Sequence, residues 1–559
     1  SVEATGFQKA VQPVFTLVLN QVANLNIQLK VGQVTQVVEV NSGPPIMQTQ
    51  TSELSTVIDA KTNVSLPLAA RDYIQLTLLA PGSVTPNPQT LSQAQRIDNG
   101  GRPYINGNRE QSNNFMLDGM DNNQVSDNLV GYQPSPDAIL EFNMITQNAP
   151  AEFGNFSGGV VSVSLKSGTN QYHGDAFEFF RNDALNANSW QNGLVVPGGS
   201  VTTKAALRWN QYGAIFGGPI IKNKLFFFTD YQGQRFDHPT TTKQLNVFTA
   251  NERNGDFGIL CTNTGAFGPG GTTCPGGTQL KNPSNGNPIP FNNFLTAGIA
   301  PNPVATALFE NSFYPTPING ALTQNAIYTT NSALNEEQGD AKVDWNISDK
   351  DHFSGRYSEE RQANPLTNSL AILPDDSGDT KIRSGVFSWT HVFSPTLLNE
   401  FRAGANYVDL NTINSGSPAA LGNLGQTLGI PNGNENGPGL LQISQNAQGG
   451  STTLGNVTAF GGAGVTQKFA DTVFQYEDNL TINHGRHTFK AGFQFWRQRI
   501  NTYYSGNNGT LGFFDFSGQY SGSPESDFYL GMADHNGRGI VGGTWGQRSS
   551  VFGGYFQDD

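Results

Sequence analysis

The chain has 559 residues, of which only 13% are charged, and its formal net charge is −13. An acidic chain lacks the basic face that nucleic acid requires, so we expect no nucleic-acid partner. With 37 Phe, 16 Tyr and 6 Trp, it is also unlike disordered chains, which are poor in aromatic residues. Its longest apolar runs, such as residues 14–19 and 225–228, are far shorter than the ~20 residues of a transmembrane helix. A membrane location would therefore require a closed β-barrel.

Residues 1–40 alternate apolar and polar side chains, which is typical of half-buried strands. Phe15, Leu17 and Leu19 share one parity, and a second alternating run covers residues 25–31. Two or three strands are too few for an independent sheet domain. We therefore interpret this segment as the C-terminal part of a small β-sandwich.

Residues 41–165 are predicted to form a compact α+β domain. The segment 69–79 has helical spacing, with Tyr73, Leu76 and Leu79 on one stripe, and predicts a helix. Short strand and turn signals, dense in Gly and Asn, follow it.

From about residue 166 onward, alternating segments come in pairs joined by short polar turns. Three such hairpins are residues 342–347 with 353–358, 385–393 with 398–407, and 471–482 with 487–499. Long stretches rich in Gly, Asn, Ser and Pro separate the hairpins, for example residues 237–338 and 411–467. Short turns on one side and long loops on the other are typical of an outer-membrane barrel.

The faces of these strands support that interpretation. In residues 401–407 one face carries Phe and Ala side chains and the other carries Arg402 and Asn406. In residues 489–495 the polar face carries Lys490 and Gln494. We expect the apolar faces to meet lipid and the polar faces to line the lumen.

Five short motifs occur in the order found in Oar-like TonB-dependent transporters. They are LPLAARDY (66–73) with LLAPG (78–82), INGNR (105–109) with NFMLDGMDN (114–122), AEFG (151–154) with GGVV (158–161), KSGTN (166–170) with HG (173–174), and GGPI (217–220) with KLFFF (224–228). The chain resembles that family along nearly its whole length. The resemblance implies a mostly β protein with three parts: the end of a carboxypeptidase regulatory-like sandwich (1–40), a plug (41–165) and part of an antiparallel transmembrane β-barrel (166–559).

The family's barrel is expected to have 22 strands. At roughly 30 residues per strand with its loop, residues 166–559 are too few for such a wall. We therefore expect the sequence to be truncated at both ends.

An energy-coupling segment is expected between the sandwich remnant and the plug. In the family a TonB box lies here, and the candidate residues are Val37, Val38, Glu39, Val40 and Asn41. Such a box pairs with its inner-membrane partner by strand addition, which needs an extended stretch beside a flexible linker. Gly43, Pro44 and Pro45 supply the linker. The alternative is that the segment is the last sandwich strand.

A plug that fills a pore needs contacts with the wall that can be released. The candidate latch residues are Arg109, Asp118, Asp121 and Glu152. Separating paired buried charges is costly, which suits a gated latch. The alternative is ordinary turn chemistry, because Asp-Gly and Asp-Asn are strong turn formers. A calcium site at these carboxylates is a minor alternative, since the spacing does not match an EF-hand.

Cys261 and Cys274 bracket a Gly- and Thr-rich stretch, and we predict that they form a disulfide in an exposed loop. The alternative is a pair of free thiols. The sequence contains no G-x-S-x-G, H-E-x-x-H or Walker A motif. We therefore expect no enzyme activity, no catalytic residue, no metal site and no cofactor.

Three functions were weighed. The favoured one is a plugged barrel in the outer membrane that takes up a ligand, with a glycan, a peptide or a metal chelate as candidates. A TonB-type protein, outer-membrane lipid and an extracellular ligand are its expected partners, with the plug and N-terminal part on the periplasmic side. The second is a surface-binding or export-associated barrel without import. The third is a soluble β-rich hydrolase. It would be expected to carry Trp platforms and paired carboxylates, and it ranks last because the chain has only 6 Trp, spread along its length.

Overall fold

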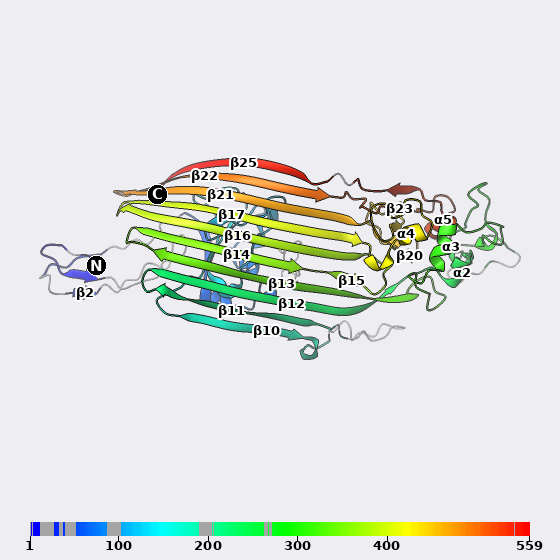
Figure 1. The fold of residues 1–559 in the computed structure, drawn as a ribbon, viewed down its shortest axis with the longest axis horizontal. Coiled ribbons are helices and arrows are strands. Elements are labelled where there is room, and N and C mark those ends of the chain that lie inside the picture. Colours follow the sequence, from blue (N-terminus) through cyan, green and yellow to red (C-terminus); the bar gives the residue numbers. More distant parts are fainter. Residues whose placement is uncertain are drawn as a thin grey trace.

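The computed structural model describes residues 2, 4–11, 27–32, 37–39, 52–85, 102–188, 204, 206–261, 267, 271–540 and 543–559. Three bodies follow one another along its long axis: a small N-terminal strand pair, a curved wall of strands with a compact domain behind it, and a body built from the long loops (Figure 1). Among the described residues, no helix combines the length and the hydrophobicity that crossing a membrane requires.

The wall is one antiparallel sheet in the order β10-β11-β12-β13-β14-β16-β17-β21-β22-β25, with the short β15 between β13 and β16. Its strands are β10 His173–Asn182, β11 Arg208–Ile221, β12 Leu225–Leu245, β13 Ala326–Asn346, β14 Asp351–Ala363, β15 Leu366–Asn368, β16 Asp375–Ser394, β17 Leu397–Gly416, β21 Val465–His484, β22 His487–Tyr504 and β25 Trp545–Asp558. The three predicted hairpins are β13–β14, β16–β17 and β21–β22. Spanning a bilayer takes about 9–11 residues of a tilted strand. β12 and β13 have 21 residues each, so both strands extend well beyond the thickness of a bilayer.

Side chains alternate across the wall as the sequence predicted. Arg402, Asn406 and Gln494 face the inner side, where Gln494 Nε2 donates to Glu477 at 3.2 Å. On the outer side, near the short turns, the rings of Trp345, Phe353 and Trp389 follow one another with centroids 5.9–6.4 Å apart. A belt of aromatic rings at this height is the usual interface anchor of an outer-membrane barrel.

The plug is an α+β domain packed on the inner side of the wall. Its central sheet has the order β3-β8-β9-β6-β7, with a separate β4–β5 pair. Its elements are β3 Leu54–Asp59, α1 Ala60–Ser65, η1 Ala69–Arg71, η2 Tyr73–Leu79, β4 Ser83–Val84, β5 Tyr104–Ile105, η4 Glu110–Ser112, β6 Asn114–Leu117, β7 Met120–Asp121, η5 Pro136–Ala138, β8 Ile139–Gln147 and β9 Val160–Leu165. Its buried core continues into the wall through Ile215, Phe228, Ile382 and Val408.

The helix predicted over residues 69–79 is wrong in type. The segment forms two 3-10 turns, η1 and η2, separated by Asp72, whose carboxylate caps η2 by accepting from the Ile74 N–H at 2.9 Å. Ala70 and Arg71 adopt positive φ values of 55° and 52°, which a continuous α-helix excludes. Tyr73 and Leu76 are buried as expected, whereas Leu79 is 56% exposed.

The N-terminal pair consists of β1 Lys9–Val11 and β2 Val37–Glu39, which pair in parallel. Val37, Val38 and Glu39 are therefore extended and hydrogen-bonded. Val40 and Asn41 lie outside the described residues.

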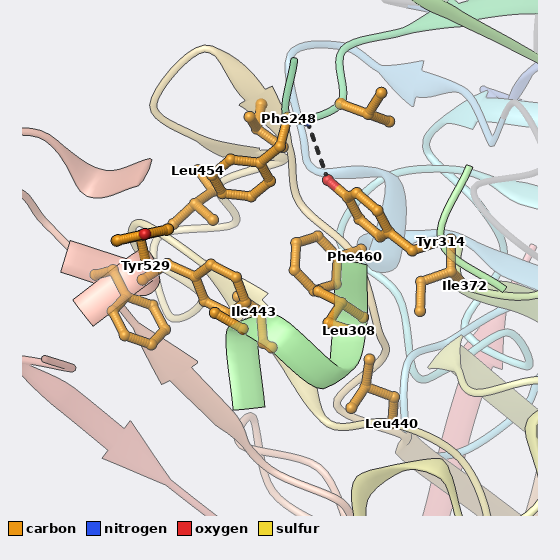
Figure 2. Close-up of a cluster of buried hydrophobic side chains, with 14 of the residues drawn as sticks. Phe248, Leu308, Tyr314, Ile372, Leu440, Ile443, Leu454, Phe460 and Tyr529 are labelled. Carbon is orange, nitrogen blue, oxygen red and sulfur yellow. Dashed lines mark hydrogen bonds between the residues drawn. The ribbon is translucent and has the colours of Figure 1, made fainter. Parts of the chain in front are cut away.

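The long loops fold into one external body with its own hydrophobic core. Its described residues come from four loops, within residues 246–325, 369–374, 417–464 and 505–544, and the core rings include Phe248, Tyr314, Phe460 and Tyr529 (Figure 2). Its elements are α2 Ala250–Arg253, η8 Gly258–Leu260, η9 Pro290–Asn292, α3 Pro303–Phe309, η10 Ala419–Leu421, α4 Leu424–Thr427, β18 Gln442–Ser444, β19 Thr453–Leu454, β20 Val457–Thr458, β23 Phe513–Asp515, α5 Pro524–Leu530 and β24 His535–Gly537. Cys261 and Cys274 form a disulfide in this body, with Cα atoms 4.9 Å apart.

Candidate functional site: the plug–wall contact

The tip of the plug hairpin β6–β7 meets two wall cations. Asp118 and Gly119 form the turn, with φ values of 47° and 77°, so the expected turn chemistry is present. The Asp118 carboxylate also lies 3.3 Å from Lys342 Nζ and 3.0 Å from Arg356 Nε. Asp118 therefore both forms the turn and pairs with two cations of the wall.

Glu152 makes the second ion pair between plug and wall. Its carboxylate lies 2.9 Å from Lys490 Nζ on β22. Both side chains remain partly exposed, so water reaches this pair.

Asp121 contacts the wall through its main chain. Its N–H donates to Gln475 Oε1 on β21 at 3.1 Å, while its carboxylate accepts from Asn123 within the plug at 2.7 Å. Burial raises the pKa of the Asp121 carboxyl to about 6. Asp121 is thus a buried plug carboxylate held by neutral donors.

Arg109 does not join this contact. It is exposed ahead of η4, and its side chain makes no cap hydrogen bond there. The buried arginine of this region is Arg102, which donates to the carbonyls of Asp127 and Asn128 at 2.8 and 3.0 Å. Arg102 therefore stabilises the plug through hydrogen bonds within that domain.

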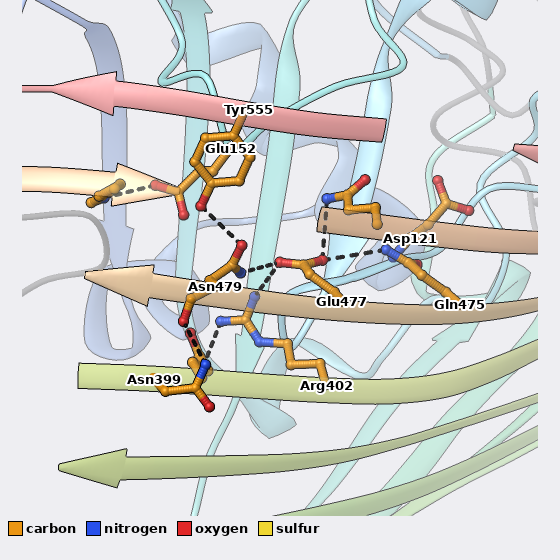
Figure 3. A network of polar contacts seen from close by, with 11 residues as sticks. Asp121, Glu152, Asn399, Arg402, Gln475, Glu477, Asn479 and Tyr555 are labelled. Atoms are coloured by element: carbon orange, nitrogen blue, oxygen red, sulfur yellow. Dashed lines mark hydrogen bonds and ion pairs between the residues drawn. The ribbon is translucent and has the colours of Figure 1, made fainter. Parts of the chain in front are cut away.

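Figure 3 shows a polar network of the wall that includes Arg402, Glu477 and Asn479. Arg402 pairs with Glu400 at 2.7 Å and with Glu477 at 3.3 Å. Gly119 packs against this guanidinium so closely that a Cβ there would lie 2.7 Å from Arg402 Cζ. The absence of a side chain at Gly119 allows the plug to rest on Arg402.

Two further polar contacts are outside the predicted set. Asp471 on β21 accepts from Gln124 Nε2 at 2.6 Å and from the Ser126 hydroxyl at 2.8 Å. The Tyr132 hydroxyl donates to Asp340 on β13 at 2.6 Å. Gln, Ser and Tyr occur throughout the sequence, so no local signal distinguishes these three.

Arg71, a buried arginine of the plug, contacts the wall at strand β10. It pairs with Asp137 inside the plug, and its guanidinium lies 4.5 and 4.2 Å from the ring centroids of Phe177 and Phe179 on β10. Phe177 and Phe179 lie two positions apart on β10 and so share one face of the strand, but no local pattern in the sequence indicates which plug cation meets them.

Comparison with known proteins gives the site its context. Residues 164–559 match the protein family described as an outer membrane beta barrel domain. Over 258 residues the chain is 27% identical to the TonB-dependent transporter Oar of Myxococcus xanthus, covering 44% of this chain and 23% of that protein.

Among solved structures, the outer membrane transporter YddB from Escherichia coli has the same fold, with a TM-score of 0.50, 11% identity, and coverage of 90% of this chain and 54% of that one. The ferric enterobactin receptor PfeA of Pseudomonas aeruginosa gives a TM-score of 0.41 at 13% identity, over 80% of this chain and 49% of that one. The chain thus spans about a quarter of its curated relative and about half of YddB. The chain belongs to the family of outer-membrane β-barrel domains, and it is a homologue of the TonB-dependent transporter Oar.

Proposed function

We propose that the complete protein takes up a ligand across the outer membrane through its plugged barrel, driven by an inner-membrane TonB-type complex. The observation that carries this proposal is the way the plug is fastened. Ion pairs and hydrogen bonds at Asp118, Glu152 and Asp471 link plug to wall. Such contacts can be exchanged for water one at a time, which suits a plug that moves.

The coupling segment is proposed to be residues 37–41. Strand addition requires an extended main chain that can leave its present neighbour. β2 pairs with β1 over only three residues, a small number of main-chain hydrogen bonds to exchange for those of a partner. The Gly43-Pro44-Pro45 sequence follows directly.

Deletion of residues 37–41 from the complete protein tests this coupling. We expect uptake to be lost while the protein stays in the outer membrane and keeps the mobility shift on heating that marks a folded barrel. Deletion of residues 46–50, which shortens the same linker equally, is the matched control and should leave uptake intact. The readout is uptake of labelled neutral glycans, peptides and metal chelates, the three proposed ligand classes. Uptake that survives loss of residues 37–41 would contradict the coupling assignment.

A surface-binding barrel without import is the second candidate. The external body favours it, because a single hydrophobic core holds loops from four parts of the chain together as one surface. In that case cells would bind a ligand equally well with and without residues 37–41, and no uptake would be seen.

A further inference from the structure

A polar cavity of about 250 Å³ lies between the plug and the wall, beside the network of Figure 3. It lies near the short turns, because its wall residues Lys342, Ser354 and Arg402 come within a few positions of strand ends. Since a water molecule takes about 30 Å³ of liquid volume, the cavity has room for about eight waters, or for one sugar-sized ring.

The charges around the cavity balance. The carboxylates of Asp118, Glu152, Glu400 and Glu477 line it, and each is paired with a cation of the protein. Those cations are Lys342, Arg356, Arg402 and Lys490. A charged solute would therefore meet compensated charges and would lose its hydration without gaining a partner.

Hydroxyl groups supply the remaining polar lining. Ser162 and Ser164 come from plug strand β9, and Ser354 and Ser388 come from the wall. Within the described part of the chain, the hydroxyls of Ser162, Ser164 and Ser388 have no protein hydrogen-bond partner. A hydroxyl can donate and accept, so these groups match a ligand that does both.

Aromatic and apolar side chains of the wall contact the plug at other positions. Arg71 is held between Phe177 and Phe179, and Ile215 and Phe228 of β11 and β12 enter the plug core. The cavity is therefore a local feature of the contact between the β6–β7 hairpin and strands β13–β21.

We propose that this cavity binds one neutral, hydroxyl-rich ring, such as a single sugar residue, on the periplasmic side of the plug–wall contact. That a ligand binds here transiently during uptake rests on the proposed function, whereas binding of the ring to the cavity does not. The site also narrows the ligand classes, favouring a neutral glycan over a charged peptide or metal chelate.

Protection of an introduced thiol tests the site. Ser388→Cys places a thiol on the cavity wall, and both native cysteines of this chain form a disulfide, so within it this thiol alone is free. The purified complete protein is treated with a small methanethiosulfonate reagent in the presence of glucose, glucuronate or glucosamine, three rings of one size with different charge. Thr396→Cys, exposed in the turn that follows β16, is the matched control.

We expect glucose at four times its dissociation constant to slow labelling of Ser388→Cys about fivefold, because protection follows 1 + [L]/Kd. Glucuronate and glucosamine should protect much less, and Thr396→Cys should react equally under all conditions. Ser164→Cys repeats the test from the plug side if the first variant loses its heat-dependent mobility shift.

If the cavity holds water only, glucose will not protect the thiol from labelling. If all three sugars protect it equally, the cavity does not select a neutral ring over a charged one. Either result overturns the proposal. The measurement uses the resting protein without a coupling partner, so loss of uptake in the deletion test leaves this result standing.

Discussion

At the scale of single residues, the latch contacts differ in how much water reaches them. The side chains of Asp118 and Arg356 are 12% and 1% exposed, whereas those of Glu152 and Lys490 are 24% and 29% exposed. Removing one member of an enclosed ion pair leaves a buried charge without compensation, while a hydrated pair contributes little. The two pairs are therefore expected to respond differently to the same kind of substitution.

Replacing Asp118 by Asn should weaken plug seating by about 3 kcal/mol, because Lys342 and Arg356 lose their shared counter-charge. Glu152→Gln is the matched control and should cost at most about 1 kcal/mol. Hydrogen exchange of the β9 amides measures the free energy of local opening in both variants. Equal effects of the two substitutions would show that burial does not decide the strength of these pairs.

Replacing Arg71 by Lys keeps the charge but removes the planar group that lies over Phe177 and Phe179. We expect a loss of about 1–2 kcal/mol in plug attachment, measured as faster protease cleavage of η1 in the folded barrel. Arg109→Lys, at an exposed position, should change nothing. Indistinguishable cleavage of the two variants would mean that the stacked geometry does not contribute.

Some of these positions could be predicted from the sequence, because a local pattern marks them, and others could not. Strand alternation placed Lys490 and Arg402 on the inner face, because the side-chain period of a strand is two. The Asp-Gly pair identified the turn in which Asp118 lies. The choice of Arg71 and Arg102 over Arg109 depends on contacts more than a hundred positions apart for Arg71 and about 25 apart for Arg102. No local pattern records such contacts.

At the scale of elements, two strands are longer, and the loop between them is shorter, than the sequence predicted. β12 and β13 continue to Leu245 and from Ala326, into residues predicted as loop, and the remaining loop folds around Phe248 and Phe528. These two rings lie 5.6 Å apart although 280 positions separate them in the chain. Composition alone indicated polar loops, because the few apolar residues of each loop form a core only when four loops pack together.

The external body carries a titratable group that links its stability to pH. Glu252 caps α2 by accepting from the Thr249 N–H at 2.8 Å, and burial raises the pKa of its carboxyl to about 7. The folded body then binds this proton more tightly than the unfolded chain does. Its stability should fall as pH rises from about 4.5 to 7, by about 3 kcal/mol from this group.

Glu252→Gln tests that link, because Gln can keep the capping interaction without a charge. Thermal unfolding of the external body, followed by proteolysis of residues 246–325, should depend on pH in the parent and lose most of that dependence in the variant. The same slope between pH 4.5 and 7 in both proteins would assign the effect to another group.

At the scale of the whole molecule, the plug lies on the inner side of the wall, between the external body and the N-terminal strand pair (Figure 1). The external body lies at one end of the wall and the N-terminal strand pair lies beyond the other, where the short turns are (Figure 1). The cavity is lined by wall residues close to those turns. Uptake through such an arrangement requires the plug to move relative to strands β13–β22. The class of fold could be predicted from ordered motifs; the contacts between plug and wall could not.

A reversible lock between plug and wall tests this requirement most directly. A Cβ at Gly404 would lie 3.5 Å from Met120 Cγ and 2.8 Å from the Gly385 carbonyl oxygen, so Met120→Cys and Gly404→Cys can form a disulfide between β7 and β17 when the backbone at Gly385 shifts slightly. We predict that the oxidised double variant of the complete protein takes up no labelled ligand, that a reductant restores uptake, and that Met120→Cys alone is unaffected. Undiminished uptake by the fully oxidised protein would contradict a plug that moves at this contact.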